Sequence, residues 1–352
     1  MTLMTIDGSQ GEGGGQVLRT SLSLSALTGR PLRLTNIRAG RSRPGLRPQH
    51  LTAVRAVAAI CDAEVEGDEI ESQTLSFSPA GPPHSDDYDF DVEDAALHGS
   101  AGSVTLLFQA VLWPLVFAGT ESRVTLRGGT HVPFSPPFHY LAEVARPAFR
   151  EFNAFFDVKL AAWGWMQAGK GALRATIRPV PRLVPATFER VPPSRVHGVA
   201  AVTNLPAHIP QRMASRAHNL LRDAGLKTSI RPLRESGEGP GAGLFLWIPQ
   251  AGFGVLGRQG WPSEKVAEAA VAELLAFVEN EPAAVDPYLA DQLLIPMALA
   301  DGRSSFTTNR LTGHTLTNAA LLRRWLDVAI TIEGERDQPG RVTVEGLGFT
   351  VS

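Results

Sequence analysis

One arrangement of residues recurs along this chain and constrains its fold more than any single motif. A Gly-rich or turn-like lead is followed by an apolar helical segment, then by a Gly, then by a short β-branched strand. The lead GEGGG precedes such a helix and the strand PLRLTNI, and the lead GSAGS precedes another helix and the strand SRVTL. Two further pairs near the other end suggest a third copy: YLADQLLIPMALADG with SSFTT, and TGHTLTNAALLRRWL with VAITIEG. The pattern predicts a mixed α/β fold with internal repeats.

A segment with a different sequence pattern interrupts these repeats, from about Leu183 to Glu281. The proline cluster VPATFERVPP opens it and ENEP closes it, as linkers around an inserted domain often do. We therefore predict a discontinuous large domain of residues 1–183 and 281–352 and a small inserted α/β domain of residues 184–280. The loop 235–243, ESGEGPGAG, is either a cover over a ligand or a flexible hairpin connection.

Length and composition bound the class of protein. A chain of 352 residues with 43% apolar and 19% charged residues is typical of a folded protein of two domains. The single cysteine, Cys61, excludes a disulfide framework or a cysteine-based zinc site built from this chain alone. No secretion signal or long apolar run is present, so we expect a cytoplasmic protein. A net charge of -2 argues against binding nucleic acid over the whole surface, although a local basic patch is still allowed.

The Gly-rich run GEGGGQ, residues 11–16, lies directly before a predicted helix. Unpaired backbone N–H groups and the positive end of the dipole make a helix start an anion site, which would suit ATP phosphates. Glu12 would repel those phosphates unless a divalent cation lay between them, so it is a candidate metal ligand. The alternative is a simple Gly-rich turn with an exposed glutamate.

A second candidate is the loop IRAGRSRPGLRPQH, which carries four arginines within ten residues. Gly and Pro prevent a regular helix there, so the guanidinium groups are presented rather than buried. Recognition of phosphate or RNA is the functional interpretation, and a solvated basic loop is the alternative. The four residues are Arg38, Arg41, Arg43 and Arg47.

A third candidate is His314, in TGHTLTNAALLRRWL. Thr312 or Gly313 would begin a helix and place His314 in its first turn. The helix dipole opposes protonation there, so a neutral imidazole would keep a lone pair able to attack phosphorus. A capping or solvent-facing histidine is the alternative. The other histidines lack this setting, and His98, His197, His208 and His218 are expected to be structural or exposed.

Common catalytic motifs of other classes are missing. The sequence contains no HExxH, no CxxC pair, no P-loop and no GxSxG elbow. Zinc proteases, Walker-type NTPases and α/β-hydrolases are therefore poor interpretations.

Taken together, six ordered blocks resemble the RNA 3′-terminal phosphate cyclase family along nearly all of the large domain, whereas the insert matches loosely. The blocks are DGSQGEGGGQVLRTSLSLSALTG (7–29), IRAGRSRPGLRPQHLTAV (37–54), GSAGSVTLLFQAVL (99–112), RGGTHVPFSPP (127–137), YLADQLLIPMALADG (288–302) and GHTLTN (313–318). The resemblance implies an α/β (α+β) fold with a large domain of three repeated units, each a four-stranded sheet with two helices. It also implies a relation to the units of enolpyruvate transferases, and a small α/β insert.

The resemblance implies an activity and a set of site residues. His314 matches the histidine that ATP adenylylates, and Glu12 matches a carboxylate that holds a divalent metal, Mg or Mn. The implied reaction converts an RNA 3′-phosphate to a 2′,3′-cyclic phosphate through His-AMP and RNA(3′)pp(5′)A. The implied ATP-binding residues are Arg19, Arg38, Gln109, Tyr288, Leu289, Ala290, Asp291 and Gln292.

Two features keep alternatives open. Related cyclases usually follow GGT with Asp or Asn, whereas this chain has His131 there. Some relatives of this fold assist ribosome assembly and have lost the catalytic histidine, so a non-catalytic RNA-processing role is the alternative function. The presence of His314 favours the enzyme, and an enolpyruvate transferase is disfavoured because only the unit fold is shared.

Overall fold

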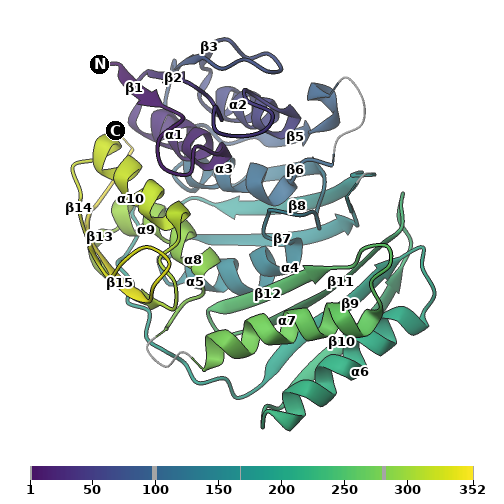
Figure 1. Cartoon of the computed structure of the whole chain (residues 1–352). Helices are drawn as coiled ribbons and strands as arrows, with labels where there is room; N and C mark the ends of the chain where they lie inside the picture. The colour runs from purple at the N-terminus through teal and green to yellow at the C-terminus, as the bar shows by residue number, and fades with distance from the viewer. Residues whose placement is uncertain (1, 97–100, 167, 280–282, 352) are drawn as a thin grey trace.

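The computed structural model describes residues 2–96, 101–166, 168–279 and 283–351 (Figure 1). His98, part of the GSAGS lead and the predicted boundary at Glu281 lie outside the described residues. No helix in the described part of the chain is long and apolar enough to cross a membrane.

The first unit has the order β-α-β-α-β-β. It comprises β1 (Met4–Asp7), α1 (Gly15–Thr28), β2 (Leu32–Thr35), α2 (Pro48–Cys61), β3 (Glu64–Glu66) and β4 (Leu75–Ser78). The strands lie in the order β1-β2-β4-β3, with β1 parallel to β2 and the other pairs antiparallel. This is a four-stranded sheet with two helices, as expected.

The second unit repeats this plan. It comprises β5 (Asp87–Asp91), η1 (Glu93–Ala95), α3 (Val104–Val116), β6 (Ser122–Gly128), a helical segment made of α4 (Phe138–Tyr140), η2 (Leu141–Ala145) and α5 (Arg146–Arg150), β7 (Phe155–Ala162) and β8 (Gly171–Arg178). Its sheet has the equivalent order β5-β6-β8-β7, again with only the first pair parallel.

The third unit departs from the expectation of four strands. It comprises α8 (Pro287–Gln292), α9 (Leu294–Leu299), β13 (Asp301–Thr308), α10 (Gly313–Trp325), β14 (Ala329–Glu333) and β15 (Gly340–Leu347), and its sheet has three strands in the order β13-β15-β14. Two isolated parallel bridges, Thr187 to Ser305 and Val285 to Thr308, occupy the place of the first strand. Pro185 has no N–H to give to a ladder, which helps to explain why this edge is so short.

The insert forms its own sheet and helical layer. It comprises β9 (Val196–Thr203), α6 (His208–Asp223), β10 (Thr228–Glu235), β11 (Gly241–Ile248), β12 (Ala251–Leu256) and α7 (Ser263–Val278). The strand order is β10-β9-β11-β12, and α6 and α7 pack on one face of the sheet (Figure 1). The hairpin interpretation of residues 235–243 is wrong, because β10 and β11 lie on opposite sides of β9.

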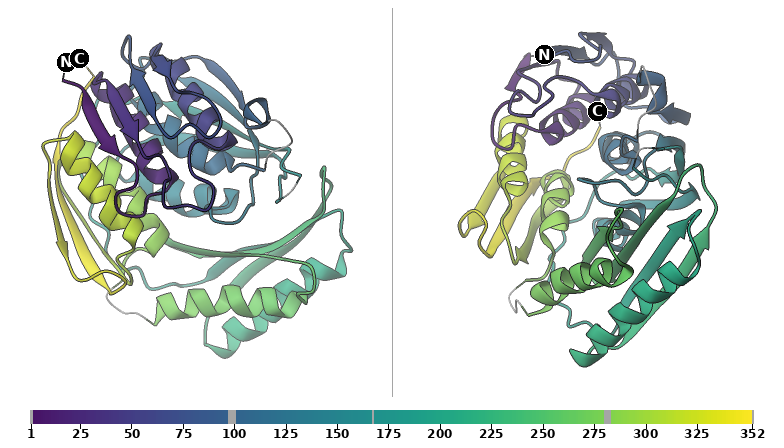
Figure 2. Two further views of the ribbon diagram at one scale, coloured as in Figure 1. Left: turned by 45° about the horizontal axis from the view of Figure 1, so that its top comes forward. Right: turned by 45° about the vertical axis from the view of Figure 1, so that its right-hand side comes forward.

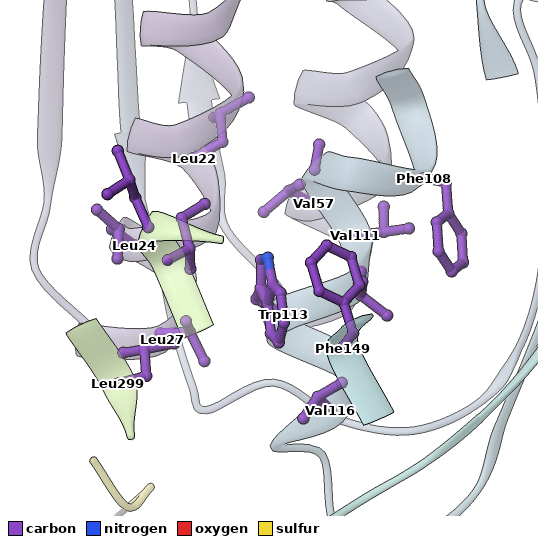
Figure 3. Close-up of a cluster of buried hydrophobic side chains, with 14 of the residues drawn as sticks. Leu22, Leu24, Leu27, Val57, Phe108, Val111, Trp113, Val116, Phe149 and Leu299 are labelled. Carbon is purple, nitrogen blue, oxygen red and sulfur yellow. The ribbon is translucent and has the colours of Figure 1, made fainter. Parts of the chain in front are cut away.

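Two hydrophobic clusters hold the chain together. The larger joins the three units, where α1, α2 and α3 pack on one another and α10 packs on α1. Figure 3 shows Leu22, Leu24 and Leu27 of α1 in the same buried cluster as Trp113, whose ring meets Phe149 edge-on at 5.1 Å between centroids. The serines between these leucines are also buried, and their hydroxyl groups keep hydrogen-bond partners. Ser23 Oγ, for example, donates to the Ala110 carbonyl at 2.8 Å.

The smaller cluster belongs to the insert and contains side chains from Val196 to Ala283. Figure 2 shows the insert as a layer set against the second unit, and the contacts run from α4 and η2 to β11 and β12. Two clusters agree with a two-domain chain, although the boundaries at residues 184 and 280 stay a prediction.

Candidate active site

The functional histidine proposed from the sequence lies where a helix begins. The helix α10 starts at Gly313, and the Thr312 hydroxyl caps it by accepting a hydrogen bond from the Thr315 N–H at 3.1 Å. His314 is therefore in the first turn, and its side chain is exposed. The predicted placement of His314 at a helix start is confirmed.

A chain of hydrogen bonds fixes the tautomer of His314. Its Nδ1 lies 3.1 Å from Gln16 Oε1, and the Gln16 amide nitrogen donates to Asp291 Oδ2 at 2.9 Å. An amide oxygen can only accept, so Nδ1 carries the hydrogen and Nε2 keeps its lone pair. Nε2 is therefore the ring nitrogen with an available lone pair.

The surroundings of His314 also keep it neutral. Desolvation lowers its pKa below the ordinary value of 6.5, and the charges of Arg19 and Arg41 act in the same direction, whereas Glu12 opposes them. At neutral pH the imidazole is then mostly unprotonated, which a nitrogen nucleophile requires.

The Gly-rich loop is packed against α10 and is not a free turn. Gly11 has a φ of +61°, and a Cβ there would lie 2.1 Å from the Thr317 hydroxyl. A Cβ on Gly313 would lie 1.9 Å from a Glu12 carboxylate oxygen. The side chains of Thr317 and Glu12 fill the space beside these two glycines. The close packing of the loop on α10 brings Glu12 beside the start of the helix, where His314 lies.

Glu12 has cationic neighbours but few potential co-ligands. Its carboxylate lies 3.1 Å from Arg336 and 3.9 Å from Arg41. Among the described residues, no group of three or more His, Cys, Asp and Glu side chains is placed to hold a metal ion. A metal at Glu12 would fit only if phosphate oxygens and water supplied most of its ligands, as is common for Mg²⁺.

The four loop arginines have different surroundings. Arg41 lies beside Glu12, and the Arg38 guanidinium donates to the carbonyls of Arg43 at 2.7 Å and of Gly45 at 2.9 Å, which holds the loop. Arg47 pairs with Glu71 at 3.0 Å on the surface, and Arg43 is exposed. The structure therefore brings Arg41 to His314 and leaves Arg47 directed elsewhere.

A cavity opens next to the Gln16–Asp291 hydrogen bond. Buried charge lies at its wall, where burial raises the pKa of Asp291 to about 7 and lowers that of Arg19 to about 10, each partly offset by the other's charge. The lining residues come from all three units: Gln16, Arg19, Thr20, Phe108, Gln109, Leu112, Trp113, Leu141, Phe149, Asp291, Gln292, Ile295 and Asn318.

A sequence-family profile decides the family. The profile described as RTC, RNA 3′-terminal phosphate cyclase, matches residues 10–332 of this chain. The chain belongs to the RNA 3′-terminal phosphate cyclase family. Curated proteins with that name are similar in sequence to this chain along most of its length. The protein from Trichormus variabilis is 49% identical over 328 residues, which cover 92% of this chain and 94% of that protein.

More distant members of the cyclase family match equally fully. The RNA 3′-terminal phosphate cyclase of Methylococcus capsulatus is 46% identical, and the match covers 98% of this chain and 97% of that protein. The RNA 3′-terminal phosphate cyclase of Archaeoglobus fulgidus is 39% identical, and the match covers 95% of this chain and 99% of that protein. Among solved structures, the enolpyruvyl transferase NikO from Streptomyces tendae aligns with 99% of this chain and 49% of its own at 12% identity. Its TM-score of 0.38 supports no conclusion.

The residues that the cyclase family resemblance assigned to ATP take different positions. Arg19, Gln109, Asp291 and Gln292 line the cavity. Tyr288 on α8 is 46% exposed and does not line this cavity, while Leu289 and Ala290 are fully buried in the core. Neither the side chains nor the backbone of those two residues is accessible in this structure, so their assignment to ATP stays a prediction.

Sequence reasoning missed two polar residues of this site. Gln16 was part of the Gly-rich motif but received no role, and Arg336 lies beyond the last motif that was recognised. The final position of GEGGGQ was a signal for Gln16, because it is the first polar side chain inside the helix that the glycines introduce. Arg336 had no local signal.

One buried carboxylate joins α8 to the insert. Asp286 accepts hydrogen bonds from the Tyr140 hydroxyl at 2.9 and 3.0 Å, from the Gly252 N–H at 2.8 Å, and from the N–H groups of Tyr288 at 2.7 Å and Leu289 at 2.8 Å. Asp286→Ala should lower the free energy of unfolding by about 3 kcal/mol, because several buried donors lose their acceptor.

Denaturant unfolding of the Asp286 variants measures this effect. Asp286→Asn should cost less, since its amide oxygen can still accept from Tyr288 and Leu289. Equal stability of Asp286→Ala and the parent protein would show that the carboxylate does not hold these elements together.

Proposed function

We propose that this chain is an ATP-dependent RNA 3′-terminal-phosphate cyclase that carries AMP on His314 Nε2. One observation supports this most: a neutral, exposed histidine at a helix start, with Nδ1 bonded to Gln16 and Nε2 free. Membership of the cyclase family supplies the substrates, ATP and an RNA with a 3′-phosphate end.

The reaction takes three phosphoryl steps. In the first, His314 Nε2 attacks the α-phosphorus of ATP, an N–P bond forms and pyrophosphate leaves. In the second, an oxygen of the RNA 3′-phosphate attacks the same phosphorus, and the N–P bond breaks to return the imidazole. In the third, the 2′-hydroxyl attacks the RNA phosphorus, loses its proton and expels AMP.

ATP is needed because a phosphate monoester has no good leaving group. The mixed anhydride of the second step provides AMP as one, and the 2′-hydroxyl is already held close to the phosphorus by the ribose. The transfers themselves depend mainly on positioning and on charge stabilisation.

Residues of this chain supply that positioning. Gln16 holds the His314 ring in the tautomer that leaves Nε2 free. Arg19 and Arg41 place positive charge near the imidazole and so near the transferring phosphate. The cavity lined by Gln109, Asp291 and Gln292 is the proposed place of the nucleoside.

A divalent cation would be held by Glu12 together with phosphate oxygens. When bound, it would neutralise part of the phosphate charge. Arg336 and Arg41 form ion pairs with the Glu12 carboxylate and so balance its negative charge beside the histidine.

We expect Glu12→Ala to shift the Mg²⁺ dependence of AMP labelling to higher concentration, because one carboxylate ligand is lost. Initial labelling rates over a Mg²⁺ series measure the shift. Arg336→Ala is the matched control, since it removes the partner of Glu12 but no ligand. An unchanged Mg²⁺ dependence in Glu12→Ala would remove Glu12 from the metal site.

The pH dependence of labelling follows from the lowered pKa of His314. The neutral form attacks, so labelling at saturating ATP should fall toward acid pH with a midpoint below 6.5. Single-turnover labelling from about pH 5 to 9 tests this. A midpoint of the acid limb at or above 6.5 would contradict the neutral nucleophile.

A cyclisation assay tests the proposed function itself. An oligoribonucleotide with a labelled 3′-phosphate should become resistant to phosphatase when this protein, ATP and Mg²⁺ are present, and not when ATP is omitted. If the end stays sensitive under all conditions, the chain is the alternative, a non-catalytic RNA-processing relative.

A further inference from the structure

A run of aromatic and histidine rings crosses the junction between the second unit and the insert. His139 stacks on Phe245 of β11 at 5.2 Å between centroids and on Trp247 at 6.4 Å, and Trp247 stacks on His197 of β9 at 6.3 Å. On the other side His139 meets Trp163 at 5.5 Å. The rings come from four separate segments of the chain and meet only in the folded protein.

The run has a buried base and an accessible rim. His131 is fully buried, with Nδ1 2.8 Å from the Thr130 hydroxyl and Nε2 2.9 Å from His139 Nδ1, and Phe245 is buried too. By contrast, His139, Trp163 and Trp247 are partly exposed and His197 is exposed. We call these four residues the junction rings. Each of them packs against another ring and is at least partly open to solvent.

Positive charge lies at the same place. Strand alternation puts Arg231 of β10 on the same face as His197. Burial lowers the pKa of His139 to about 4, and the nearby charge of Arg231 acts in the same direction. Arg231 is exposed and makes no ion pair within the described residues. The acid on this face of β10 is Glu235, four residues further along, or about 13 Å.

The junction rings are connected to the candidate active site by α8. Tyr140 follows His139 in the chain and donates to Asp286, which begins α8. Asp291, near the other end of that helix, accepts from Gln16, and Gln16 contacts His314. The helix α8, six residues long and about 9 Å in rise, is thus the element that links the rings to the reacting histidine.

We propose that the junction rings, with Arg231, bind the single-stranded RNA that precedes the reacting 3′-phosphate. Bases would stack on the exposed ring faces, and Arg231 would pair with a backbone phosphate. Flat rings combined with positive charge are the elements by which proteins hold single strands without reading their sequence. This inference rests on the proposed function, since it concerns the strand whose end is cyclised.

The competing explanation is that the rings only hold the insert to the second unit. His131, Trp165 and Phe245 fulfil that role, because they are buried. A purely structural role does not account for His197, which is exposed, nor for Arg231, which lies beside the rings without an ion pair among the described residues. A binding measurement can separate the two explanations, since a purely structural ring should affect stability and leave RNA affinity unchanged.

The experiment uses the full chain and two 3′-phosphorylated RNAs, a dinucleotide and a strand of about 12 nucleotides, in equilibrium binding. Trp247→Ala and Arg231→Ala test the surface, and Trp247→Phe should restore most of the stacking. Trp261→Ala is the matched control, because Trp261 is also a half-buried ring of the insert but is covered by Arg258 at 3.6 Å. Arg222→Ala is the control for an exposed arginine.

We expect Trp247→Ala to weaken binding of the long RNA by about 5- to 150-fold, with dinucleotide binding unchanged. Arg231→Ala should act in the same direction and should also reduce the salt dependence of binding. The two controls should bind like the parent protein. Thermal unfolding and RNA-independent AMP labelling report whether each variant is folded and has an intact ATP site.

Two outcomes would overturn the inference. In the first, folded Trp247→Ala and Arg231→Ala proteins bind the long RNA as the parent does. In the second, the parent shows no gain in affinity from dinucleotide to long strand, and Trp247→Ala abolishes self-association in sedimentation, which would make the rings an interface between copies. A parent protein that binds RNA but incorporates no AMP would instead contradict the proposed function.

Discussion

His314→Ala should incorporate no AMP from ATP labelled at its α-phosphate, whereas the parent protein should be labelled to near one AMP per chain. The substitution removes the attacking atom, the His314 Nε2 that the contact of Nδ1 with Gln16 leaves unprotonated. The fold should survive, because the side chain is exposed and the Thr312 cap of α10 is unaffected.

Two variants serve as controls for this result. His197→Ala removes another exposed histidine, and its labelling should match that of the parent. Gln16→Ala keeps the nucleophile but loses the acceptor for Nδ1–H, so labelling should slow by roughly tenfold without disappearing. If His314→Ala is labelled like the parent, the nucleophile has been assigned to the wrong residue.

An RNA whose last sugar is 2′-deoxy should stop at the second step. Adenylylation of His314 and transfer of AMP to the 3′-phosphate do not use the 2′-hydroxyl. The deoxy end should therefore accumulate as the 3′-adenylylated species, because no internal nucleophile is left to expel AMP. Gel separation of labelled oligonucleotides detects this species directly.

The matched ribose end should pass through the adenylylated species quickly and accumulate as the cyclic product. If the deoxy end gains no AMP while the ribose end cyclises normally, the 2′-hydroxyl is needed before or during AMP transfer. The proposed order of steps would then have to be abandoned.

Much of the fold could be predicted from local patterns. The Gly leads, the apolar helices and the β-branched strands recur because each unit is built from the same order of elements. The first strand of the third unit could not be predicted. Thr187 and Ser305 pair although the insert separates them in the chain, and isolated bridges such as this one have no periodicity to detect.

The site was predictable to the extent that its residues lie in motifs. Glu12 and His314 are in conspicuous Gly-led segments, and the structure places them together. The bond from Gln16 to His314 spans 298 positions of the chain, and that from Arg336 to Glu12 spans 324. Contacts of that separation depend on how the units pack, which no local pattern in one sequence reveals.

Peptide mapping of the adenylylated protein tests the central claim most directly. The full chain is incubated with ATP and Mg²⁺, digested under conditions that preserve the acid-labile N–P bond, and analysed by mass spectrometry. The account predicts the added mass of one AMP on the peptide that contains His314, and its loss when RNA with a 3′-phosphate is added before digestion. AMP on any other residue, or an unmodified chain under conditions in which the RNA is cyclised, would contradict it.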